Sequence, residues 1–135
     1  MIALRIDATI ANLDTVIDYM YEKLMEKGCS KKIILQLRVA VEELYVNIAH
    51  YAYGDKTGYA DFEVEFEGDN AIITLIDEGV PFDPLAKLDP DTTLSVEDRP
   101  IGGLGIFMAK KSVDDFTYKN ENGKNITQLT KKIAE

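Results

Sequence analysis

The sequence predicts an α+β fold of two layers, in which a mixed, mostly antiparallel sheet is covered on one face by about three helices. Segments of alternating apolar and polar residues come in pairs joined by short turns, as in antiparallel sheets with one solvent-facing side. Segments with helical spacing come in series, which argues against an alternating parallel-sheet fold. The 135 residues suffice for one domain, 1–135, with one core.

The first part of the chain is expected to form an edge strand followed by two helices. Apolar residues recur at helical spacing on either side of Gly28, which suits a helix stop, and Ser30, which suits the N-cap of the next helix. The second helix keeps one apolar side and ends near Tyr53. The expected ranges are residues 1–7, 12–28 and 31–54.

Two strands are expected next, joined by the turn "EGDN". In the first strand Phe62, Val64 and Phe66 point one way. The residues expected on the opposite, solvent-facing side are the acids Asp61, Glu63, Glu65 and Glu67. The second strand is "NAIITLID".

Regular patterning fails between residues 78 and 103, a segment that contains all four prolines of the chain. So long a loop in a small domain is usually functional or disordered. The stretch "LGIFMAKKSV" then predicts a third helix. Two strands joined by "ENGK" close the chain as a hairpin.

Charge and composition argue against several classes of function. The formal net charge of −9 repels nucleic acid and anionic lipid, so neither is expected as a direct partner. No apolar run approaches the roughly 20 residues of a membrane span, and the N-terminus lacks a signal-peptide pattern. The single cysteine, Cys29, permits no internal disulfide, which suits a reducing cytoplasm.

The stretch "VEELYVNIAHYAYG" places polar residues on a helix that also has an apolar face. Glu43 and Asn47 are one turn apart and face the same way. The Asn47 amide oxygen can ligate Mg²⁺, whose shell is completed by phosphate and water, and the Glu43 carboxylate can order a water or a hydroxyl. The alternative interpretation is a solvated helix face with local hydrogen bonds.

Two further stretches have the composition of ligand-binding loops. In "IDEGVPFDP" Asp77 ends an apolar strand and Gly79 follows two residues later. A flat ligand could therefore donate to the acid and lie close to a backbone position that has no Cβ. The alternative is an ordinary turn. In "RPIGGLGIFMAKK" glycines open a helix, whose N-terminal amides can bind phosphate. This second stretch matches neither the P-loop nor the dinucleotide pattern, and a plain glycine-rich helix start is the alternative.

The order of these stretches resembles the Bergerat-type (GHKL) ATP-binding domain, which gyrase-type ATPases, a heat-shock chaperone, mismatch-repair ATPases and histidine kinases share. The resemblance covers nearly the whole chain. Within that group the sequence is most similar to the anti-sigma-factor serine kinases. "VEELYVNIAHYAY" is similar to their N-box, E-x-x-x-N-x-x-x-H-[AG]-Y, "DEGVPFDP" to their D-x-G-x-G-F box, and "GGLGIF" to their second glycine box.

The resemblance implies a role for each matching residue. Asn47 would bind Mg²⁺, and Glu43 would be the general base that orients the attacking serine hydroxyl. Asp77 would accept from the adenine amino group, while Gly79 would let the ring lie against the backbone. The implied remaining contacts are phosphate-binding amides under a lid at about residues 83–101, an arginine near the γ-phosphate, and a threonine, Thr127 or Thr130, near adenine. The residues implied for these phosphate and adenine contacts are Arg99, Gly102, Gly103, Leu104, Gly105 and Thr127.

The resemblance therefore implies a cytoplasmic, homodimeric kinase that uses ATP and Mg²⁺ to phosphorylate a small anti-sigma antagonist of the STAS type and so regulates a sigma factor. Two departures keep an alternative open. Tyr51 stands where the N-box has histidine, which leaves His50 one place early, and Pro81 replaces the second glycine of its box. The alternative is a nucleotide-dependent switch that binds protein partners without phosphate transfer; a scaffold without nucleotide is a third hypothesis.

Overall fold

The computed structural model describes residues 4–54, 56–81 and 103–133, with only the backbone of 103–105. The described elements follow the predicted order. They are β1 (Leu4–Asp7), η1 (Ile10–Asn12), α1 (Leu13–Glu26), α2 (Lys31–Asn47), η2 (Ile48–Ala52), β2 (Tyr59–Glu67), β3 (Asn70–Asp77), α3 (Gly103–Ser112), β4 (Asp115–Glu121) and β5 (Lys124–Lys132).

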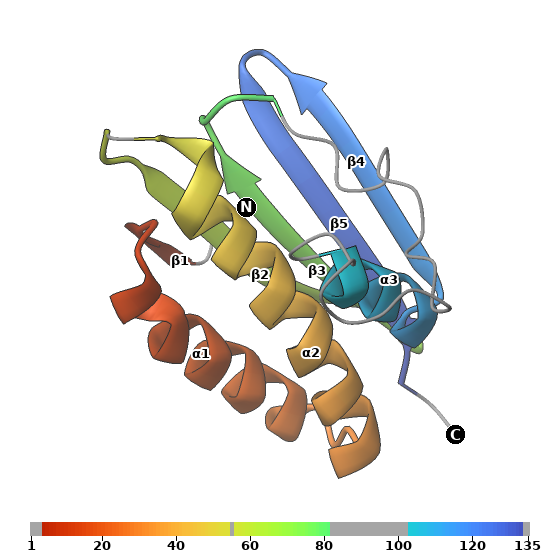
Figure 1. The fold of residues 1–135 in the computed structure, drawn as a ribbon. Coiled ribbons are helices and arrows are strands. Elements are labelled where there is room, and N and C mark those ends of the chain that lie inside the picture. The colour runs from red at the N-terminus through yellow and green to blue at the C-terminus, as the bar shows by residue number, and fades with distance from the viewer. Residues whose placement is uncertain (1–3, 55, 82–102, 134–135) are drawn as a thin grey trace.

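The strands form one sheet in the order β1-β2-β3-β5-β4, and helices α1, α2 and α3 cover one of its faces (Figure 1). This confirms the predicted two-layer α+β architecture. The pairings among the described strands are all antiparallel, without the parallel component that the prediction allowed. No helix in the described ranges combines the length and apolarity needed to cross a membrane.

The core lies between the helical layer and the inner face of the sheet. Helix α2 runs between α1 and α3 (Figure 1), and alternate residues of β2, β3 and β5 point toward it, as a pleated strand requires. Burial of these apolar side chains is the main stabilising contribution. The largest fully buried side chains include Met20, Leu24, Ile34, Leu37, Tyr45, Phe62, Ile73, Leu75 and Leu129.

The helix ends follow the predicted chemistry except at one place. Gly28 has a left-handed φ of 84°, and the Ser30 hydroxyl accepts from the amide of Ile33 at 3.3 Å, so both predicted boundaries are confirmed. The second helix was expected to be regular to about residue 54. Instead α2 ends at Asn47, and the wider π-helical turn η2 follows it. Such turns often occur at functional sites.

The prediction that all four acids of β2 face solvent is wrong for Asp61, which is only 1% exposed. The Arg5 guanidinium donates to both of its oxygens, from Nε at 2.7 Å and from Nη2 at 2.9 Å. Arg5 lies opposite Asp61 on the edge strand β1, and its guanidinium also stacks 3.9 Å from the ring centroid of Tyr59. The acid is buried because a neighbouring strand supplies a matched cation.

The hydroxyl of Tyr45 is expected to contribute measurably to stability. Tyr45 is fully buried on α2, and its hydroxyl lies 2.7 Å from the carbonyl oxygen of Thr9, to which it donates. We expect Tyr45→Phe to lower the free energy of unfolding by about 1 kcal/mol, because the hydrogen bond from the Tyr45 hydroxyl to the Thr9 carbonyl is lost. Urea denaturation checks this. Tyr21→Phe is the control, since that hydroxyl has no hydrogen bond among the described residues; an equal loss in both variants would contradict the prediction.

Candidate functional site

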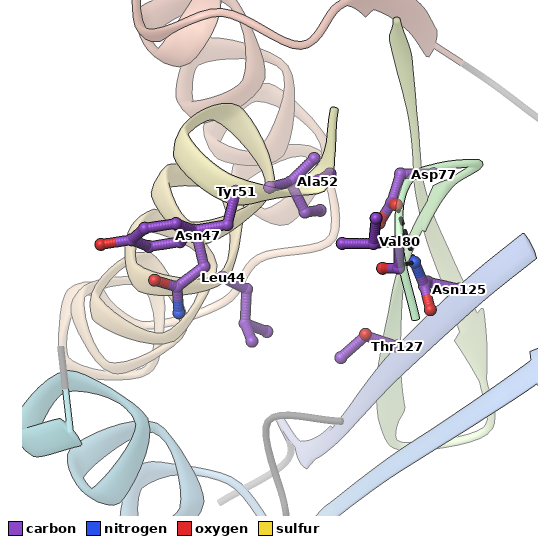
Figure 2. Close-up of a pocket in the computed structure, with 9 residues that line it drawn as sticks. Leu44, Asn47, Tyr51, Ala52, Asp77, Val80, Asn125 and Thr127 are labelled. Carbon is purple, nitrogen blue, oxygen red and sulfur yellow. Dashed lines mark hydrogen bonds between the residues drawn. The ribbon is translucent and has the colours of Figure 1, made fainter. Parts of the chain in front are cut away.

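A pocket lies between the end of α2 with η2 and the adjoining ends of β3 and β5 (Figure 2). Its empty volume, which includes space open to solvent, is about 410 Å³. The lining is mostly apolar, with a few polar side chains. The lining residues are Leu44, Asn47, Ile48, Tyr51, Ala52, Asp77, Val80, Asn125 and Thr127.

Asp77 is the last residue of β3, at an inward-facing position of the strand. The alternation that buries Ile73 and Leu75 also buries Asp77, which is only 4% exposed. Its Oδ1 accepts two hydrogen bonds, from Nδ2 of Asn125 at 2.9 Å and from the amide of Gly79 at 2.9 Å. Among the described residues Oδ2 has no partner, so this oxygen could accept a hydrogen bond from a ligand.

The environment of Asp77 disfavours its charge. Burial raises the pKa of the Asp77 carboxyl above its ordinary value, and the hydrogen bonds from Asn125 and Gly79 offset part of that shift. A buried acid with a raised pKa at the wall of an apolar pocket is a candidate for function. The arrangement suits a flat ligand that presents an N–H donor.

Gly79 lies against the backbone of η2. A Cβ at this position would come within 2.1 Å of the carbonyl oxygen of Ala52, and the amide of Val80 donates to the same oxygen at 2.8 Å. The structure therefore requires glycine here for the close approach of the loop to η2. The predicted role of Gly79, backbone access for a ligand ring, remains a prediction.

Asn47 lies across the pocket from Asp77 (Figure 2). Its Nδ2 is buried and has no hydrogen-bond partner among the described residues, and such an atom costs about 1–3 kcal/mol unless a ligand or water satisfies it. An asparagine amide can present either its nitrogen or its oxygen after a half-turn about its last bond. In the described part of the chain no three His, Cys, Asp or Glu side chains form a metal site. A cation here would therefore depend on the Asn47 oxygen and the ligand's own oxygens, which suits Mg²⁺.

The other predicted residues are only partly described. Glu43 is half-buried on α2, one turn before Asn47, and lies outside the pocket lining. Arg99, Gly102 and the expected lid at residues 83–101 lie outside the described residues. The residues that form the first turn of α3, described by backbone alone, are Gly103, Leu104 and Gly105.

The structure distinguishes between two pairs of neighbouring candidates. Thr127 is buried and lines the pocket, whereas Thr130 lies on the opposite face of β5 because strand residues alternate. Tyr51 lines the pocket and is 55% exposed. His50 is exposed and lies outside the lining, as expected from its shift of one place in the sequence.

Sequence reasoning missed Asn125, which lies near the start of β5 and donates a hydrogen bond to Asp77. Its Nδ2 also donates to the carbonyl oxygen of Val80 at 2.9 Å. One signal was present in the sequence. Asn125 shares an inward-facing side with Thr127 and Leu129 in a strand of alternating pattern, and a polar residue at such a position needs partners.

Comparison with known proteins gives consistent results. The family model of the histidine kinase-like ATPase domain matches residues 6–131. The serine-protein kinase RsbW of Oceanobacillus iheyensis is 32% identical over 114 residues, which cover 80% of this chain and 71% of that protein. The serine-protein kinase RsbW of Staphylococcus aureus is 29% identical over 114 residues, with the same coverage.

Two solved structures share the fold. The structure of the RsbU and RsbW domains of Rv1364c from Mycobacterium tuberculosis aligns with a TM-score of 0.64 at 23% identity, over 98% of this chain and 32% of that one. The histidine kinase AdeS of Acinetobacter baumannii aligns with a TM-score of 0.57 at 14% identity, over 100% of this chain and 70% of that one. At these identities the likeness concerns the fold alone.

We expect Asp77→Asn to leave the ligand-free fold at least as stable as the wild type at neutral pH. Both hydrogen bonds to Asp77 end on Oδ1, so an amide oxygen can accept them. Because the pKa of Asp77 is raised on folding, its charge opposes folding above the unfolded pKa, and this penalty shrinks as pH falls through the folded pKa. Thermal unfolding at neutral and at mildly acidic pH checks this. A clear loss of stability at neutral pH would make Asp77 a structural anchor instead.

Proposed function

The chain belongs to the histidine kinase-like ATPase domain family, and on that premise we propose that it is an ATP- and Mg²⁺-dependent serine kinase of the anti-sigma-factor type. One observation carries the proposal. One apolar pocket holds a buried carboxylate, Asp77, and a buried amide nitrogen, that of Asn47, and neither Oδ2 of Asp77 nor this nitrogen has a partner among the described residues. These groups match the two ends of an adenine nucleotide.

The base end of the nucleotide would lie against the sheet side of the pocket. Oδ2 of Asp77 would accept a hydrogen bond from the adenine amino group, with Thr127 beside it on β5. The ring would occupy the space between the apolar walls, which exclude water and strengthen that hydrogen bond. The walls are formed by Leu44, Ile48, Ala52 and Val80.

The phosphate end would lie at the helix side. Asn47 would hold Mg²⁺ through its amide oxygen, and the ion, when bound, supplies charge neutralisation for the transferred phosphoryl group. The backbone amides at the start of α3, from Gly103 to Gly105, would donate to the phosphates, with Gly102 and Arg99 completing this end. Neutralisation matters in a chain with a net charge of −9.

Phosphoryl transfer would require one further group on the protein. The serine oxygen of the partner forms the new bond to the γ-phosphorus while the bond to the bridging oxygen of ADP breaks. The carboxylate of Glu43 would orient the serine hydroxyl and take its proton. Few side chains are needed because positioning and charge neutralisation supply most of the rate enhancement.

The partners follow from the family resemblance and from the similarity to serine-protein kinases named RsbW. We infer that the substrate is a small anti-sigma antagonist of the STAS type, and that the chain, as a homodimer in the cytoplasm, binds a sigma factor when the antagonist is phosphorylated. The whole chain would act as one domain under a lid at about residues 83–101.

A second candidate function is a nucleotide-dependent switch that exchanges protein partners without transferring phosphate. Two departures from the kinase motifs favour it. Tyr51 lines the pocket at the place of the N-box histidine, and Pro81 replaces the second glycine where the chain leaves β3. Both functions need the same nucleotide site, so that site is tested first.

We expect the purified chain to bind ATP and ADP with micromolar affinity. Asp77→Asn should abolish binding, because the amide nitrogen then meets the adenine amino group donor to donor. Asn47→Ala should remove the dependence on Mg²⁺ while keeping part of the affinity. Calorimetric titration with each nucleotide, with and without Mg²⁺, measures both effects. Absence of binding by the wild type would leave only the scaffold hypothesis.

We expect Glu43→Gln to separate the kinase from the switch. If Glu43 is the general base, the variant should transfer phosphate to a co-purified STAS-type partner at least about 100-fold more slowly, with unchanged ADP affinity. Intact-mass spectrometry of the partner serine gives the rate. An unchanged rate would exclude Glu43 as the base. A wild type that binds ATP and the partner, but leaves the serine unmodified, would favour the switch.

A further inference from the structure

Asn125 makes more hydrogen bonds than any other side chain described at the pocket. It pairs with Asp77 across the β3–β5 ladder and is only 4% exposed. Its Nδ2 donates to Oδ1 of Asp77 at 2.9 Å and to the carbonyl oxygens of Val80 at 2.9 Å and Gly79 at 3.4 Å. The amide therefore connects the carboxylate to the first residues of the loop.

The orientation of this amide follows from its neighbours. A carboxylate and two carbonyls are acceptors only, so the atom of Asn125 that faces them must be the nitrogen. On the other side Oδ1 of Asn125 accepts from the hydroxyl of Tyr118 and from Nδ2 of Asn120 at 3.2 Å. Both of these residues lie on β4. The amide is thus held from two strands and cannot turn over without losing hydrogen bonds.

This network determines which hydrogen bond Asp77 can offer to a ligand. Two N–H donors meet Oδ1, so the oxygen in that position must be an acceptor, and any partial rotation about the Cβ–Cγ bond would weaken both hydrogen bonds. The same donors stabilise the charged form against the effect of burial. Oδ2 is consequently presented to the pocket as an acceptor.

We propose that Asn125 is the positioning residue that fixes Asp77 as an acceptor and thereby makes the pocket select a 6-amino purine over a 6-oxo purine. The inference rests on the proposed nucleotide binding and extends it to base selectivity. A 6-amino group donates to Oδ2. A 6-oxo group places an acceptor against an acceptor, and a site built for one partner discriminates strongly against the mismatched one.

Removal of the Asn125 amide should relax this selectivity. With one donor fewer, burial favours the neutral carboxyl more strongly, and the carboxyl can rotate. A protonated, rotated carboxyl can donate to a 6-oxo group as well as accept from a 6-amino group. The loss should therefore fall on ADP more than on IDP, which differs from ADP only at the base.

The test compares ADP and IDP binding by calorimetry in the intact chain. We expect the wild type to prefer ADP by at least about tenfold. Asn125→Leu, which keeps the branched shape of the side chain without its polar atoms, should reduce that preference toward unity, and Tyr118→Phe should reduce it by a smaller factor. Tyr118→Phe removes only the hydroxyl that donates to Asn125, so it retains the test if Asn125→Leu fails to fold. Asn70→Ala, at the exposed opposite end of β3, is the control and should keep the wild-type ratio.

The outcomes separate this inference from the proposed function. A wild type that binds neither nucleotide overturns the proposed function and this inference with it. A wild type that binds ADP and IDP equally overturns the inference alone. A folded Asn125→Leu or Tyr118→Phe variant that weakens both nucleotides by the same factor also overturns it, because Asn125 then has only a structural role. A preference that falls as described, while the control is unchanged, supports it.

Discussion

The burial of the Asp77 carboxylate is the constraint on which the pocket depends. A charged group with little exposure is tolerated only where donors meet it, and here the donors come from two directions, the amide of Gly79 and the side chain of Asn125. The first requires a tight turn after β3, and that turn fits only because Gly79 has no side chain to collide with Ala52. The second requires β5 to pair with β3 in one register. A slip by one residue would move Asn125 to the other face of the sheet.

A second set of contacts holds the same segment from the other side. The hydroxyl of Tyr53 accepts from the amide of Glu78 at 2.9 Å and donates to the carbonyl oxygen of Tyr59 at 2.6 Å, and the hydroxyl of Tyr59 donates to the carboxylate of Glu78 at 2.7 Å. Tyr59 in turn lies under Arg5 of the edge strand. The residues after β3 are therefore fixed by β5 on one side and by β2 on the other. A ligand that meets Asp77 meets a preorganised group, which lowers the entropic cost of binding.

Local patterns in the sequence were sufficient for the fold and for half of the pocket. Alternation, helical spacing and turn residues predict the element order, and Asp77 and Asn47 were found because they interrupt apolar patterns. Thr127 was implied only by the family resemblance, which left Thr130 as an alternative. Apart from the early end of α2 at Asn47, the errors concern contacts between strands that are distant in the chain. Asp61 is buried because Arg5 lies opposite it, and Asn125 contacts Asp77 because β5 pairs with β3. Such registers depend on the packed sheet, and no local pattern encodes them.

The two ends of the pocket differ in how many of their described polar atoms have hydrogen-bond partners within the protein. At the sheet end every atom of the Asn125 amide and one oxygen of Asp77 are already paired, so the protein itself stabilises the geometry that we propose for base recognition. At the helix end Nδ2 of Asn47 is buried and lacks a partner among the described residues, so a ligand could complete that end. On the proposed function, a nucleotide would gain affinity mainly from its base, while its phosphates and cation would meet an amide that has no partner among the described residues. This division suits a protein that must retain a nucleotide while its phosphate end changes.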